Sequence, residues 1–117
     1  LKGVPYVEMR VQVGATRFRV PDICFSFEEG FPEILREPPF LVIEILSSED
    51  RVSRLLSRLA DYENFGVPFI FVVDPFERQA YRFQSHGLQP ITDGVLRTSD
   101  PEIVVDIHER FRAIYGQ

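Results

Sequence analysis

Residues 40–75 read FLVIEILSSEDRVSRLLSRLADYENFGVPFIFVVDP and contain two apolar runs separated by an amphipathic segment. The first run, residues 40–46, is interrupted only by Glu44, which is typical of a central strand covered on both faces. The second run, residues 68–73, is a further apolar strand. A strand, a helix and a strand in this order predict a right-handed parallel crossover, so the fold class is α/β.

The segment between the two runs is predicted to be a helix. Its apolar side chains recur at helical spacing on one side: Val52, Leu55, Leu56, Leu59 and Tyr62. Ser47 and Asp50 fit the spacing of a capping box and supply the chemistry of a helix start. Gly66 and Pro68 end the helix.

The chain before residue 40 is predicted to form a β-hairpin whose second strand is extended past Pro21. Residues 6–13 alternate between apolar and polar, and residues 16–20 form a hairpin partner that ends at Pro21. If the period of two continues past Pro21, Asp22 shares the face of Phe18 and Val20, so its carboxylate is aimed at the interior. Residues 23–27 then extend the strand, and residues 28–39 are a surface loop with one helical turn at 33–36.

The chain after residue 75 is predicted to extend the sheet in antiparallel fashion. The candidate strands are residues 79–84, 88–91 and 95–98, with a last short strand at 103–107 and a small helix at 109–115. At 117 residues the whole chain, 1–117, is expected to be a single domain.

Composition limits the classes of function. The net charge of −5 argues against broad attraction to nucleic acid but leaves room for a locally basic groove. Cys24 is the only cysteine, so neither an internal disulfide nor a zinc site of cysteine and histidine is expected. No stretch is long and apolar enough to cross a membrane and no secretory signal is present, so a soluble, cytoplasmic protein is expected.

Asp22 and Glu44 are the candidate chemical groups. They lie on separate predicted strands, and adjacent strands are about 4.8 Å apart, close enough for two carboxylates to converge on one cation. A lone ionised carboxylate within an apolar strand is costly unless something compensates it. Oxygen-only ligation suits Mg²⁺ or Mn²⁺, and such a metal could promote hydrolysis of a nucleic-acid backbone.

Four motifs carry a resemblance to a known family. They are VPD at 20–22, LVIEILS at 41–47, DRVSRLLSRLADYENFGVPFIFVVDP at 50–75 and the following Tyr81. Over residues 16–84 the chain resembles the Uma-two-type endonucleases of the PD-(D/E)xK restriction-endonuclease-like superfamily. The resemblance implies a mixed β-sheet flanked by helices and a metal-dependent endonuclease that hydrolyses DNA. It also implies that Asp22, Glu44 and the main-chain carbonyl of Ile45 hold Mg²⁺ or Mn²⁺.

The sequence departs from the superfamily pattern at its lysine. Leu46 occupies the usual position, and the matching helix position of Uma-two-like proteins holds Arg58. Arginine stays protonated and is a poor proton acceptor, so either Arg58 performs the electrostatic role or hydrolysis is impaired. The only lysine, Lys2, lies far upstream. Arg51, Arg54 and Arg58 form a ridge on the predicted helix that could meet phosphates.

Several alternatives stay open. Uma-two-like proteins usually have a further stretch before the first strand seen here, so this chain is expected to be a fragment or a reduced version. Asp22 could be a turn residue, Glu44 a strand acid paired with an arginine, and the arginine ridge a solvated helix face that forms ion pairs with Asp50 or Asp61. A non-catalytic domain that binds nucleic acid or protein is the second hypothesis. A homodimer is expected because two symmetric sites cut a duplex most simply.

Overall fold

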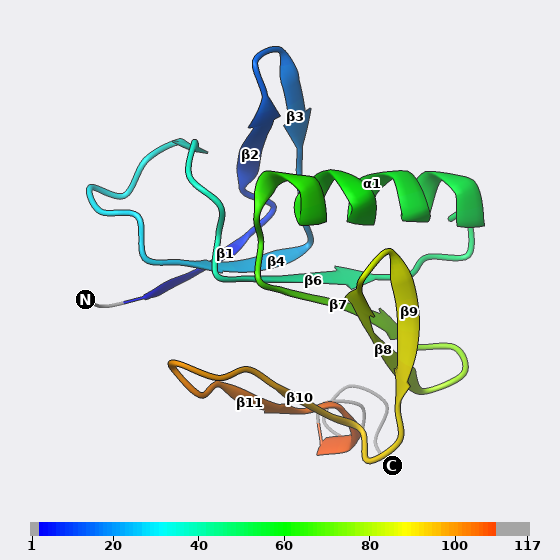
Figure 1. Ribbon diagram of the computed structural model, residues 1–117. Coiled ribbons are helices and arrows are strands. Elements are labelled where there is room, and N and C mark those ends of the chain that lie inside the picture. The colour runs from blue at the N-terminus through cyan, green and yellow to red at the C-terminus, as the bar shows by residue number, and fades with distance from the viewer. Residues whose placement is uncertain (1–2, 110–117) are drawn as a thin grey trace.

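The centre of the protein is a mixed six-stranded sheet, seen in a computed structural model that describes residues 3–109 (Figure 1). Its strands, in spatial order, are β1 (Val4–Val7), β4 (Ile23–Ser26), β6 (Leu41–Ile45), β7 (Phe69–Asp74), β8 (Gln79–Gln84) and β9 (Gly87–Ile91). The apolar run at 40–46 therefore forms a central strand, as predicted.

The predicted crossover is present. Strands β6 and β7 pair in parallel, with Leu41 opposite Phe69 and Ile45 opposite Val73, and α1 (Val52–Phe65) connects them. Every other neighbouring pair in this sheet is antiparallel. Gly66 ends the helix with φ of 105°, a left-handed conformation that costs glycine little.

The sheet separates two apolar cores because side chains alternate between its faces. Helix α1 covers one face (Figure 1), and the buried residues there are Val11, Cys24, Leu35, Val42, Leu55, Leu59, Tyr62, Val67, Ile70, Val72 and Phe83. The other face packs against the ribbon of β10 (Val95–Arg97) and β11 (Val104–Asp106), with a core of Leu41, Ile43, Phe71, Val73, Ala80, Leu96 and Ile107. Glu44 follows the alternation of Val42, so it faces α1.

The prediction of one strand over residues 6–13 is wrong. The chain breaks at Glu8, whose φ of 54° turns it, and the Glu8 N–H donates to the Asp22 carbonyl at 3.2 Å. After the break, β2 (Arg10–Gly14) pairs with β3 (Arg17–Arg19) and with β5 (Ile34–Leu35) in a separate three-stranded sheet. Val7 and Val11, predicted to share one face, differ as a result: Val7 is exposed and Val11 is completely buried.

The start of the helix also differs from the prediction. Asp50 and Ser47 close a turn of their own, because Asp50 Oδ2 accepts from the Ser47 N–H at 2.8 Å. Helix α1 begins after Arg51, which provides no side-chain cap. Val52 and Leu56 are exposed, so only Leu55, Leu59 and Tyr62 of the predicted stripe are buried.

Three further predictions need comment. Residues 33–36 contain the short strand β5 instead of a helical turn, because Ile34 and Leu35 pair with β2. Strand β10 pairs with β11 and does not extend the central sheet. The helix predicted at 109–115 lies outside the described residues except for Glu109. Within residues 3–109 the structure contains no helix with the length and apolarity needed to span a bilayer.

Candidate active site

Asp22 and Glu44 are brought together by the pairing of β4 with β6. The antiparallel register places Ile23 opposite Ile43 and Cys24 opposite Val42. Continuing the pairing by one residue in each strand places Asp22 opposite Glu44, and directly opposed residues share a face with Cβ atoms about 5 Å apart. The sequence argument for this orientation was incorrect, because Phe18 and Val20 are both exposed. Strand β4, not the preceding hairpin, sets the position of Asp22.

The carboxylate of Asp22 is fixed by the main chain of β6. Its Oδ2 accepts a hydrogen bond of 2.7 Å from the N–H of Ile45. The N–H and C=O of one residue in an extended strand point to the same side, so the Ile45 carbonyl also faces Asp22. The next N–H, of Leu46, points the other way and donates to the Val73 carbonyl at 2.9 Å. Asp22 is therefore fixed beside the end of β6, which carries Glu44 and Ile45.

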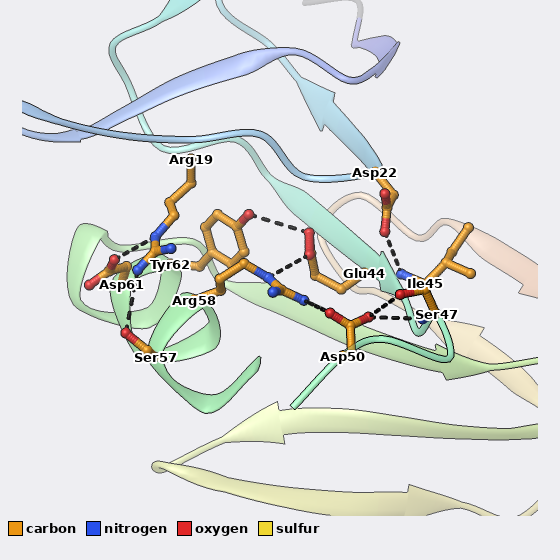
Figure 2. Close-up of polar contacts among 10 residues, drawn as sticks. All are labelled: Arg19, Asp22, Glu44, Ile45, Ser47, Asp50, Ser57, Arg58, Asp61 and Tyr62. Carbon is orange, nitrogen blue, oxygen red and sulfur yellow. Dashed lines mark hydrogen bonds and ion pairs between the residues drawn. The ribbon is translucent and has the colours of Figure 1, made fainter. Parts of the chain in front are cut away.

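Glu44 is buried, with only 3% of its surface exposed. Its Oε1 accepts from the Tyr62 hydroxyl at 3.3 Å, and its Oε2 accepts from Arg58 Nε at 3.2 Å (Figure 2). Burial, followed by the negative charge of Asp22, raises the pKa of Glu44 to about 7, and the Arg58 guanidinium opposes this rise. Asp22 is therefore close enough for its charge to act on Glu44.

Arg58 connects Glu44 to a third acid. Its terminal nitrogen donates to Asp50 Oδ1 at 3.4 Å, and Asp50 in turn accepts from the Ser47 N–H and hydroxyl (Figure 2). The Ser47 N–H bond, followed by the charge of Arg58, lowers the pKa of Asp50. An ion pair between the arginine ridge and Asp50 was one of the alternatives left open by the sequence, and Arg58 forms it. The turn at 47–50 that positions Asp50 was not predicted.

The three arginines of the predicted ridge have different environments. Arg58 is partly buried and turned to the carboxylates, whereas Arg51 and Arg54 are exposed. Among the described residues neither Arg51 nor Arg54 forms a salt bridge. Their guanidiniums are accessible to an anionic partner.

The oxygen donors of the candidate site are of the kind that a hard divalent cation binds. Carboxylate and carbonyl oxygens are the ligands that Mg²⁺ and Mn²⁺ prefer. Each Glu44 oxygen holds one proton donor, which leaves a second lone pair on each. Within residues 3–109 no three His, Cys, Asp or Glu side chains are grouped to hold a metal. The Ile45 carbonyl would be a third protein ligand beside the two carboxylates.

Several other polar or reactive side chains have structural contacts. Tyr62 is fully buried, and burial followed by the charge of Glu44 raises its pKa. Asp74 orders a turn by accepting from the N–H groups of Phe76 and Glu77. Cys24 is buried, which raises its pKa to about 11. His86 lies 2.8 Å from Glu63, a contact the sequence did not reveal, and His108 lies over Gly94.

The comparison with known proteins is informative at the level of family and fold. The sequence matches, over residues 2–109, the family Uma2, described as "Putative restriction endonuclease". The chain belongs to the Uma2 family. The family resemblance of the four motifs is thereby confirmed for nearly the whole chain. Among curated proteins, none matches this Uma2 chain significantly.

A solved structure supports the fold of this Uma2 chain. It is the crystal structure of "a putative nuclease belonging to DUF820" from Anabaena variabilis, with a TM-score of 0.75 and 18% identity. The match covers 93% of this chain and 68% of that one. At this identity the likeness establishes a shared fold, which confirms the predicted α/β class.

Proposed function

We propose that this Uma2 chain is a metal-dependent endonuclease that hydrolyses DNA phosphodiester bonds. The observation that carries the proposal is the position of Asp22 opposite Glu44, with the Ile45 main chain held against Asp22. Family membership supports the same class of reaction. Asp22, Glu44 and the Ile45 carbonyl would hold Mg²⁺ or Mn²⁺. The chemistry supplied by such an ion is polarisation of the phosphodiester and a lower pKa for a nearby water.

Arg58 is proposed as the electrostatic substitute for the superfamily lysine. Its guanidinium contacts Glu44 and Asp50 and keeps 23% of its side chain exposed. Because it stays protonated, it can stabilise the negative charge that develops on the phosphate but cannot accept a proton. Asp50 neutralises part of its positive charge. The stabilisation that Arg58 gives to a phosphate therefore depends on whether the phosphate replaces Asp50 as its partner.

Nicking of a supercoiled plasmid tests the proposal. The original chain is expected to nick DNA with Mg²⁺ or Mn²⁺ and not in EDTA, and Asp22→Ala or Glu44→Ala is expected to abolish the activity. Asp93→Ala is the matched control, because Asp93 is an exposed acid of a separate segment, paired with Arg97. Cleavage that survives both site substitutions would refute the proposal.

A second candidate function, a non-catalytic domain that binds nucleic acid or protein, is favoured by one observation. Both oxygens of Glu44 already hold proton donors, and one of these donors is Arg58, at the helix position where Uma-two-like proteins have a lysine. Arg58→Lys separates the two candidates. Activity that appears only in Arg58→Lys would favour the non-catalytic reading, whereas activity in the original chain favours the endonuclease.

The assembly and location of the protein belong to the proposal as well. We propose one domain per chain and a cytoplasmic homodimer, because two symmetric sites would cut both strands of a duplex. Sedimentation of the chain with and without DNA measures the oligomeric state. A monomer in both conditions would remove the dimer from the account without affecting the site.

A further inference from the structure

We propose that the β2–β3 hairpin is a nucleic-acid-contacting arm that presents Arg10 and Arg17 to the phosphates of a DNA duplex at the candidate site. The inference rests on the proposed function, to which it adds the surface that holds the substrate. In Figure 1 the hairpin rises past α1, away from the central sheet and on the same side of it as the helix. In this view the tip of the hairpin extends beyond α1.

The charge of the hairpin is opposite to that of the chain. The segment between Glu8 and Asp22 holds three arginines and no acidic residue, in a protein of net charge −5. Phosphate contacts by arginine supply most of the sequence-independent affinity for DNA. An acidic protein can bind a duplex only where such charge is concentrated, and this hairpin is one such place.

The inner face of the hairpin is fixed to α1 and still carries surplus positive charge. Arg19 Nε and Arg17 Nε both contact Asp61 Oδ2, at 2.8 and 3.1 Å. Arg19 also donates to Ser57 at 3.3 Å (Figure 2). One carboxylate thus faces two guanidiniums, and 61% of the Arg17 side chain remains exposed. The contacts with the helix hold the arm in place without neutralising it.

The outer face presents a second cation in a supported position. Arg10 lies with its guanidinium carbon 5.4 Å from the centre of the Phe18 ring, and Phe18 is itself 44% exposed. A guanidinium over an aromatic ring is held by cation–π attraction, which reduces the entropy lost when it binds a phosphate. An exposed phenylalanine on a short hairpin therefore has a role as the support of Arg10.

The arm leads directly to the candidate active site. Strand β3 ends at Arg19, and Asp22 follows three residues later. Arg19 also pairs with Asp61, which precedes Tyr62 on α1, and Tyr62 donates to Glu44. A duplex bound along the hairpin, with Arg10 reaching it from the outer face and Arg17 from the inner face, would have neighbouring phosphates at the end of β6.

Binding measured apart from cleavage tests this inference. The anisotropy of a short fluorescent DNA duplex is followed over a series of salt concentrations in EDTA. The test variant is Arg10→Ala with Arg17→Ala, and the matched control, Arg36→Ala with Arg97→Ala, removes the same charge from two other exposed positions. The salt slope of log K is expected to fall by about 1.8 in the test variant, since each lost phosphate contact lowers it by about 0.9. The control should keep the original slope.

Conservative variants make the outcomes unambiguous. Arg10→Lys with Arg17→Lys should restore most of the slope, because phosphate contact needs the charge. Three results would contradict the proposal that the hairpin contacts DNA. They are an unchanged salt slope in the alanine variant, an equal fall in the control variant, and no DNA binding by the original chain. Plasmid nicking that needs Asp22 alongside an unchanged slope would leave the endonuclease proposal standing. DNA binding that depends on Arg10 and Arg17, without any nicking, would support the arm and contradict the endonuclease proposal.

Discussion

Asp22 Oδ2 lies 2.7 Å from the main-chain nitrogen of Ile45 and accepts its hydrogen bond. This side-chain contact continues the connection between β4 and β6 beyond the last pair of the ladder, Ile23 with Ile43. One oxygen of Asp22 is thus used to fix the strand end, while the other carboxylate oxygen is available for a ligand. Asp22 has a structural and a proposed chemical role that substitutions can separate.

Asp22→Asn is expected to keep the first role and lose the second. An asparagine oxygen still accepts from Ile45, but it lacks the charge that a divalent cation requires. Hydrogen exchange of the Ile45 amide should stay slow in Asp22→Asn and become faster in Asp22→Ala, which should also lose about 1 kcal/mol of stability. Nicking should be lost in both. Full activity in Asp22→Asn would exclude Asp22 as a charged metal ligand.

Arg58→Ala is expected to destabilise the protein by about 2 kcal/mol at pH 8, because it leaves the buried, ionised Glu44 without its cation. At pH 5 Glu44 is protonated in the folded protein, so the loss should fall below about 1 kcal/mol. Urea unfolding at both pH values measures the difference. Arg54→Ala, on an exposed position of the same helix, should change stability by less than about 0.5 kcal/mol. An equal loss at the two pH values would argue against an ionised pair.

Glu44→Gln is expected to change how stability depends on pH in metal-free buffer. Folding raises the pKa of Glu44 from 4.5 to about 7, so between these values the folded protein keeps a proton that the unfolded chain releases. Stability therefore falls as pH rises through this window and is constant above it. The glutamine variant lacks this fall. As pH rises from 4.5 to 8, its free energy of unfolding should therefore increase relative to that of the original chain by up to about 3 kcal/mol. Parallel curves would show that Glu44 is not perturbed.

The sequence predicted the central elements well because their patterns are local. The apolar runs at 40–46 and 68–73, the helical spacing between them and Gly66 each specify one element, and the short crossover leaves one arrangement of the two strands. The adjacency of Asp22 and Glu44 was also predicted, although partly for a wrong reason. Strand β4, not the face of Phe18 and Val20, determines it.

The features that the sequence did not predict depend on contacts between residues far apart in the chain. Apolar and polar residues alternate without interruption across Glu8, so the alternation does not indicate that the chain turns there. In the sequence Asp50 fits the start of a helix. Its contacts with Ser47 and Arg58 are what place it beside the candidate site. The attachment of the hairpin to α1 through Arg19 and Asp61 links residues 42 positions apart, which no local pattern reveals.

The most direct test of the account is calorimetric titration of the chain with Mn²⁺, compared with Glu44→Ala and Asp22→Ala. The account predicts one binding event per chain in the original protein and none in either variant. An Asp93→Ala variant should bind as the original does. Binding that is unchanged without Glu44, or absent from the original chain, would contradict the claim that Asp22 and Glu44 hold a cation between them.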